Sequence, residues 1–224
     1  MGREEAGRPD RAIESPIAAV KGVNPGARER LRQRALRLEY LTIGWNVVEA
    51  VVALAAGEVA SSIALVGFGL DSIIEVAAGV TVLWRFQQRR LEEGKAESRA
   101  ARIVGLTFFA LAAYVGYTAL GNLWLRQRPR FSLPGLILAA LSLAAMPALG
   151  IAKRRVAAAL QSRALAADAL ETLFCAYLSG ALLMGLALNG ILGWWWADPI
   201  AGLLMAAFMV REGIEVFSPG RHPN

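Results

Sequence analysis

The sequence predicts an all-α membrane protein: a bundle of six transmembrane helices with the N and C termini in the cytoplasm. Of its 224 residues, 56% are hydrophobic, and the mean hydropathy is +0.44, which is too apolar for an ordinary soluble domain. Six apolar runs each approach the roughly 20 residues that a helix needs to cross the hydrocarbon core of a bilayer. Basic residues gather between these runs. We therefore expect a multi-pass integral protein of the cell membrane, surrounded by the lipid bilayer.

Three regions follow from this pattern. Residues 1–37 are polar and basic and are expected to form a cytoplasmic tail whose last part forms an interfacial helix. The transmembrane domain is expected over residues 38–215, and residues 216–224 form a second short cytoplasmic tail. We place the six spans near residues 38–57, 62–84, 102–124, 132–152, 164–188 and 191–211.

The orientation follows from the connections between spans. Lys and Arg residues are dense in the segment 85–102 and again after the fourth span, from Lys153 to Arg163, so both segments are expected in the cytoplasm. The short connections around Glu58 and Asn189 carry no basic residue, as expected outside. The connection 126–130 holds three arginines and disagrees, but the other connections outnumber it. The net charge is +6, but the Lys and Arg residues form no basic patch interleaved with aromatic residues, so no nucleic acid partner is expected.

Charged residues inside two of the spans point to a function. In the fifth span, Asp168, Glu171 and Cys175 stand at positions i, i+3 and i+7, which share one face of a helix. In the second span, Asp71 and Glu75 stand at i and i+4. A carboxylate at membrane depth is costly unless it is paired, faces a polar cavity or binds an ion. Two such helices can supply four donors that converge on one cation.

The types of donor atom do not identify the metal. Asp71, Glu75, Glu171 and Cys175 offer three hard oxygen donors and one soft sulfur. Four donors suit tetrahedral zinc, the carboxylates equally suit manganese, iron or cobalt, and a thiolate also accepts cadmium. The sequence therefore predicts a divalent metal cation as the bound substrate without deciding which one.

The spans show almost no interior basic residue to pair with these acids. Clustered carboxyl groups without such partners are expected to hold protons until a cation replaces them, which is the physical basis of proton-coupled cation exchange. Glu49 and Asp168 are expected to serve as accessory or proton-relay groups. Asp198 is expected to cap the last helix at its outer end, with Pro199 in the first turn.

At this point the residues resemble a known family, the cation diffusion facilitators, over about residues 38–215. The run from Asn46 and Glu49 into Asp71-Ser72-Ile73-Ile74-Glu75 resembles the approach to the family's Asp-x-x-x-Asp metal motif. The stretch from Ser162 to Glu171 resembles the approach to its second motif, and Trp196-Ala197-Asp198-Pro199 resembles the opening of its last span.

The resemblance implies a six-span transporter that moves divalent metals out of the cytoplasm in exchange for protons, by alternating access around a site at mid-membrane. The four family ligands then fall on Asp71, Glu75, Glu171 and Cys175, of which Asp71 is a common family choice. The family also implies a homodimer. The chain is expected to be a compact member that lacks the family's C-terminal cytoplasmic domain.

Two other readings remain. A membrane protein of the same fold that binds metal without transporting it has the same sequence features. An intramembrane aspartyl protease needs two facing aspartates, for which Asp71 and Asp168 are candidates, but such enzymes place an aspartate directly after Gly-x-Gly, and here Leu70 intervenes. The spans contain no histidine to act as a base or a metal ligand, so hydrolase chemistry is disfavoured and the protein is not expected to be an enzyme.

Overall fold

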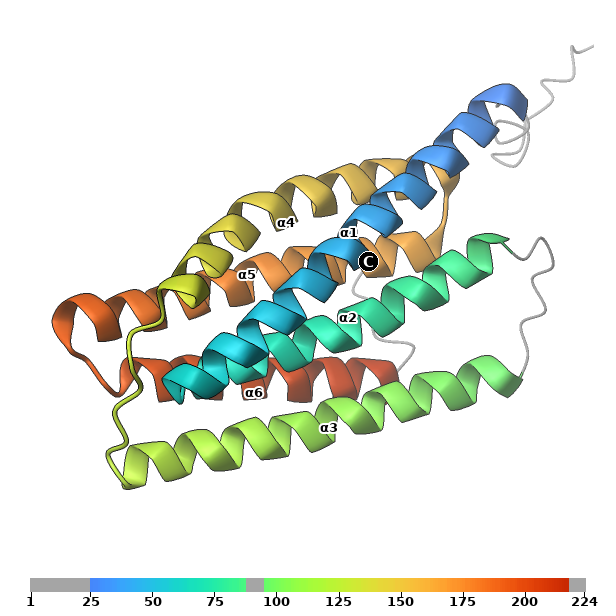
Figure 1. The fold of residues 1–224 in the computed structure, drawn as a ribbon. Helices are drawn as coiled ribbons and strands as arrows, with labels where there is room; N and C mark the ends of the chain where they lie inside the picture. The colour runs from blue at the N-terminus through green and yellow to red at the C-terminus, as the bar shows by residue number, and fades with distance from the viewer. Residues whose placement is uncertain (1–24, 88–94, 218–224) are drawn as a thin grey trace, which may run out of the picture.

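The computed structural model describes residues 25–87 and 95–217, and these residues form helices joined by short turns, without a strand among them (Figure 1). The prediction of an all-α membrane protein is confirmed. The helices are α1 (Pro25–Ala60), α2 (Ile63–Gln87), α3 (Lys95–Trp124), α4 (Leu133–Leu160), α5 (Arg163–Leu192) and α6 (Ala197–Phe217). They run alternately in opposite directions along one elongated bundle.

Three pairs of helices lie along one another: α1 with α2, α4 with α5, and α3 with α6. The helix α2 lies against α1, α3, α5 and α6, so its side chains reach most of the bundle. The main apolar core takes side chains from five helices, among them Ala53, Phe68, Met146, Leu182 and Met205. The helix α3 lies to one side and joins the bundle through two separate apolar clusters with α2 and α6.

The α1–α2 and α4–α5 turns use the same local device. Each has one residue with positive φ, Ser61 at 53° and Gln161 at 52°, followed by a serine that precedes the next helix. The hydroxyls of Ser62 and Ser162 each accept a hydrogen bond from the backbone N–H three residues later, at 3.2 and 3.3 Å. A serine in this position satisfies one of the N–H groups left open at a helix start. The two helices α2 and α5 therefore begin in equivalent ways.

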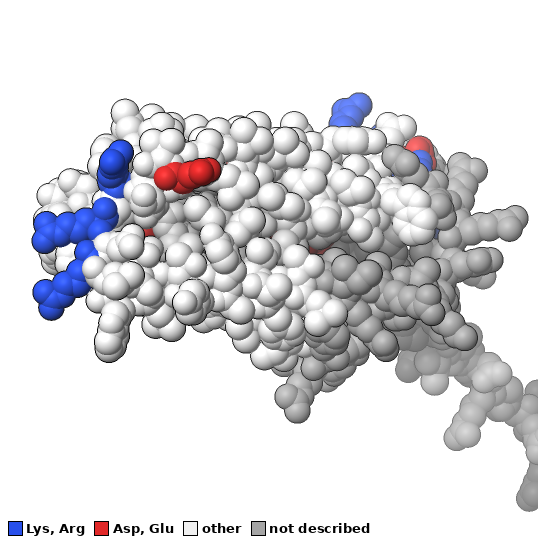
Figure 2. All heavy atoms as spheres, turned by 60° about the horizontal axis from the view of Figure 1, so that its bottom comes forward, with Lys and Arg blue, Asp and Glu red and all other residues white. Residues whose placement is uncertain are grey.

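The outer surface fits a bilayer. Large apolar side chains are exposed along the helices, including Tyr117 at 82% and Ile191 at 80%. Five helices, α1 to α5, contain stretches long and apolar enough to cross a membrane, and α6 packs among them with Asp198, Arg211 and Glu212 in its sequence. In Figure 2 most charged side chains lie near the two ends of the bundle, and the surface between them is almost entirely uncharged. Both ends carry basic groups on this face, so the orientation of the termini stays a prediction.

The helices α1 to α5 are longer than the predicted spans, and α6 begins at Ala197 instead of near residue 191. The helix α1 already begins at Pro25, so residues 25–37 continue the first span as one helix. The helix α5 continues to Leu192, and the connection expected around Asn189 is instead a turn at 193–196. The side chain of Asn189 donates a hydrogen bond to the carbonyl of Pro129, at 3.0 Å, and so ties α5 to the α3–α4 connection. Residues 1–24 and 218–224 of the predicted tails, and 88–94 of the basic segment, lie outside the described residues.

The sequence predicted that Asp198 caps α6, and this prediction is wrong. It is the second residue of α6, and its fully buried carboxylate accepts hydrogen bonds from the backbone N–H of Ile63, at 3.1 Å, and from the hydroxyl of Ser62. The helices α2 and α6 start at the same end of the bundle, so an acidic side chain in the first turn of one reaches the open N–H groups of the other. Asp198 thus fastens α6 to the start of α2.

Candidate metal site

The candidate ligands occupy matching positions on two antiparallel helices. Asp71 and Glu75 stand nine and thirteen residues after the serine that caps α2, and Glu171 and Cys175 stand nine and thirteen residues after the serine that caps α5. With a rise of about 1.5 Å per residue, both pairs lie roughly 14 to 20 Å from the starts of their helices. The helices α2 and α5 run in opposite directions, and these offsets are close to half the roughly 30 Å thickness of a bilayer core, so the two pairs lie near the same depth.

All four candidate ligands line one cavity between α2, α3, α5 and α6. Asp71 is 8% exposed and Cys175 is 1% exposed, and Glu75 and Glu171 are partly buried. Apolar side chains such as Phe108 and Phe174 form much of the remaining wall. Charge interactions are stronger in such surroundings than in water, so a cavity with several carboxyl groups attracts a cation strongly. The structure therefore brings together the four residues that the sequence singled out.

The closest group within the described residues consists of Glu49, Glu75 and Cys175. Each offers one ligand atom, and these atoms lie within 4.8 Å of one another. Asp71 and Glu171 line the same cavity but stand outside this triple. Glu49, predicted to be accessory, thus joins Glu75 and Cys175 in this group, and Asp71 and Glu171 do not.

The contacts of Glu49 indicate that it organises the site. It is fully buried, and one carboxylate oxygen accepts hydrogen bonds from the Trp45 indole N–H, at 2.6 Å, and from the Ser142 hydroxyl. The other oxygen accepts from the Ser72 hydroxyl, at 3.2 Å, and from the Cys175 thiol, at 3.9 Å. These donors come from α1, α4, α2 and α5. Because both oxygens already have donors, Glu49 has little capacity left for a cation and instead fixes the surrounding helices.

Glu75 is oriented by Asn46. The side-chain N–H of Asn46 on α1 donates to Oε2 of Glu75, at 2.6 Å. A hydrogen bond of this kind holds a ligating carboxylate in place before the cation arrives, and such outer contacts contribute substantially to metal affinity. The resemblance to the family had included Asn46 in its first motif, and the structure gives it this contact.

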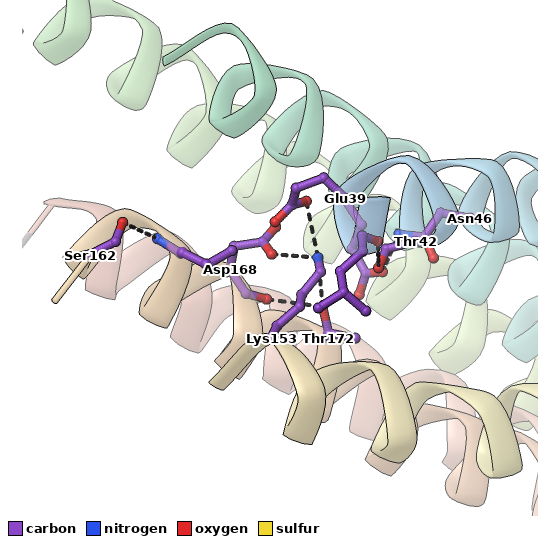
Figure 3. Close-up of polar contacts among 10 residues, drawn as sticks. Glu39, Thr42, Asn46, Lys153, Ser162, Asp168 and Thr172 are labelled. Atoms are coloured by element: carbon purple, nitrogen blue, oxygen red, sulfur yellow. Dashed lines mark hydrogen bonds and ion pairs between the residues drawn. The ribbon is translucent and has the colours of Figure 1, made fainter. Parts of the chain in front are cut away.

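The prediction that the interior acids lack a basic partner is wrong at Asp168. Lys153, expected in a cytoplasmic connection, is fully buried on α4, because α4 continues to Leu160 and turns this side chain toward α1 and α5. Its ammonium lies 2.5 Å from Oδ2 of Asp168 and 3.1 Å from Oε2 of Glu39, and it donates to the Thr172 hydroxyl at 3.4 Å (Figure 3). Asp168 is thus part of a buried ion-paired cluster next to the candidate metal site.

Sequence reasoning missed three buried or cavity-lining residues, Glu39, Lys153 and Glu212. The signal for Glu39 was present: Glu39, Thr42, Asn46 and Glu49 follow a 3-4-3 spacing and share one face of α1, and all are less than 5% exposed. Glu39 was overlooked because it stood at the edge of the expected first span. Glu212 stood just past the expected end of the last span, and it lines the cavity of the candidate ligands.

Comparison with known proteins agrees with this geometry. The family model of the cation efflux transmembrane domain matches residues 40–221, which include every residue of the candidate site. Transmembrane protein 163 of Xenopus laevis is 23% identical over 198 residues, a match that covers 87% of this chain and 70% of that protein. The family match spans most of the chain. The protein therefore belongs to the cation efflux family of integral membrane proteins, which transport metal cations.

Proposed function

We propose that this protein exports a divalent metal cation from the cytoplasm in exchange for protons, and that Asp71, Glu75, Glu171 and Cys175 bind the cation. The observation that carries the proposal is the one cavity that these four residues line, at matching depths on two antiparallel helices. Membership of the cation efflux family supports the transport of a metal cation. The choice of ligands, the proton exchange and the direction are our inference.

The exchange follows from the charge of the cavity. Its lining holds the carboxyl groups of Asp71, Glu75, Glu171 and Glu212 and the thiol of Cys175. In the absence of a cation, protons on these groups keep the buried charge small. A divalent cation that binds takes the place of protons, which leave the site, and the return of protons after the cation has left restores the empty state.

Alternating access then requires the helices around the cavity to open toward one side of the membrane at a time. The ligands lie on α2 and α5, and these helices contact each other as well as α6. If some of these helices rock against the rest of the bundle, the same site can open first to one side of the membrane and then to the other. A homodimer with cytoplasmic termini is part of the same proposal.

Flux measurements on purified protein in proteoliposomes test the proposal. Vesicles with a pH-sensitive dye inside are supplied in turn with zinc, cadmium, cobalt, manganese and iron(II). We expect uptake of at least one metal with proton movement in the opposite direction, and loss of both in Asp71→Ala and Glu171→Ala. The matched control is Glu58→Gln, because Glu58 is an exposed acid at the end of α1.

Two results would count against the proposal. Normal metal-dependent proton movement in Asp71→Ala would remove this residue from the site. Tight metal binding without flux of any metal would favour a non-transporting member of the same fold.

A further inference from the structure

A second, smaller cavity lies beside the candidate metal site. Its wall includes Glu39, Thr42 and Asn46 from α1, Lys153 from α4, and Asp168 and Thr172 from α5. Glu75 and Glu171 line both cavities, so these two candidate ligands stand between them. The second cavity therefore adjoins the metal site and lies between α1, α2, α4 and α5.

The charges around the second cavity do not balance. Four carboxyl groups, those of Glu39, Glu75, Asp168 and Glu171, face one ammonium, that of Lys153. Lys153 contacts only two of these groups in the described structure, Glu39 and Asp168. An excess of buried carboxyl groups is costly unless protons or further cations neutralise it. The cavity is thus chemically suited to a second positive charge.

Two buried oxygens in this cavity have no hydrogen-bond donor among the described residues. They are Oε1 of Glu39, a residue that is 0% exposed, and Oδ1 of Asn46, a residue that is 1% exposed. The other oxygen of Glu39 accepts from Lys153, and the amide nitrogen of Asn46 donates to Glu75. Leaving a buried acceptor unsatisfied costs about 1–3 kcal/mol, and such groups are few in native proteins. Both are hard oxygen donors, and a divalent cation is a partner that suits them.

We propose that this second cavity is a transit site for a divalent cation, bound by the carboxylates of Glu39 and Asp168 and the amide oxygen of Asn46. The ammonium of Lys153 is its resident counter-ion. Lys153 neutralises the two carboxylates while the site is empty, and a cation of higher charge displaces it. The cation then passes to Glu75 and Glu171, which line both cavities. This inference rests on the proposed function, because transit requires the neighbouring metal site as its destination.

The position of the cavity agrees with transit between the metal site and one face of the membrane. Asp168 stands about one helical turn closer to the start of α5 than Glu171 does. The second cavity therefore lies toward the end of the bundle where α4 ends and α5 begins, which is the end expected in the cytoplasm (Figure 3).

Manganese binding tests the inference, because Mn²⁺ prefers oxygen ligands and its binding is measured directly by electron paramagnetic resonance. In the wild type we expect two classes of bound Mn²⁺. The double variant Asp71→Asn with Cys175→Ala changes residues that line only the first cavity. It is expected to lose the tighter class and keep the weaker one. Adding Glu39→Gln to this background is expected to remove the weaker class.

The outcomes separate the two proposals. Equal Mn²⁺ binding with and without Glu39→Gln, or the absence of a weaker class in the wild type, would overturn the transit site. A third outcome is a wild-type protein that shows no metal flux and only the weaker class of bound Mn²⁺, which Glu39→Gln removes. This outcome would support the second site and refute the proposed function of the first.

A second variant guards against a folding defect in Glu39→Gln. Lys153→Met removes the ammonium but keeps a side chain of similar length, and it leaves Glu39 and Asp168 without their cation. We expect a lower melting temperature in the double-variant background without metal, and recovery on adding Mn²⁺. The recovery is expected to disappear when Glu39→Gln is added. If Mn²⁺ does not restore Lys153→Met, the lysine is a structural ion-pair partner only and the inference fails.

Discussion

The carboxylate of Asp198 on α6 accepts a hydrogen bond from the backbone N–H of Ile63 at the start of α2, at 3.1 Å. Its other oxygen accepts from the hydroxyl of Ser62, whose own oxygen accepts from the backbone N–H of Leu65. One acidic side chain therefore fastens the start of the helix that carries Asp71 and Glu75 to another helix of the bundle.

Replacing this carboxylate tests its contribution to stability. Asp198→Ala leaves the Ile63 N–H and the Ser62 hydroxyl buried without their acceptor, and we expect the free energy of unfolding to fall by about 1–3 kcal/mol. Asp198→Asn keeps one acceptor oxygen and is expected to lose less. Reversible unfolding of the purified protein in mixed micelles measures both. Wild-type stability in Asp198→Ala would show that the contact contributes nothing.

Glu49→Gln is expected to be damaging although it preserves shape. Both oxygens of Glu49 accept hydrogen bonds, so an amide nitrogen in place of either one faces a donor such as the Trp45 N–H or the Ser72 hydroxyl. We expect a loss of about 1–3 kcal/mol in the free energy of unfolding, together with weaker metal binding. Glu58→Gln, at an exposed position of the same helix, is the control and is expected to change neither quantity. Similar stability in the two variants would contradict the organising role of Glu49.

Cys175→Ser tests whether the thiol binds the cation. Sulfur favours zinc and cadmium over manganese, so its replacement by a hydroxyl is expected to weaken zinc and cadmium binding by about tenfold more than manganese binding. Competition titrations with the three metals on one preparation give the ratio directly. An equal change for all three metals would mean that Cys175 fills space beside the site without ligating.

Replacing glycine by alanine is expected to have opposite effects on the free energy of unfolding at two positions of α1. A Cβ at Gly57 would lie 2.9 Å from the backbone nitrogen of Val66, where the start of α2 cannot move without disturbing its cap. We expect Gly57→Ala to lower the free energy of unfolding by about 1–3 kcal/mol. A Cβ at Gly44 would meet nothing within 4 Å, so Gly44→Ala is expected to stabilise α1 by about 0.5–1 kcal/mol. Thermal unfolding of both variants measures the difference, and the same sign in both would refute the close packing at Gly57.

Much of the fold and of the candidate site follows from local sequence. Long apolar runs must become helices in a membrane, because a helix satisfies its own backbone hydrogen bonds there. The spacing of Asp71 with Glu75, and of Glu171 with Cys175, places each pair on one face of its helix. Equal offsets from two serine caps, each about half the thickness of a bilayer core, then bring these pairs to the same depth once the helices are antiparallel.

Only the tertiary structure decided which helix faces pack against one another. Lys153 looked like part of a basic connection, yet α4 carries it between α1 and α5, where it pairs with Glu39 and Asp168. Asp198 looked like the cap of its own helix and caps α2 instead. The physical reason is the same in both cases. Helical periodicity determines which residues share a face, whereas the partner of a buried charge depends on how helices distant in sequence pack, because a charge hidden from water takes the opposite charge or open N–H group that packing brings within reach.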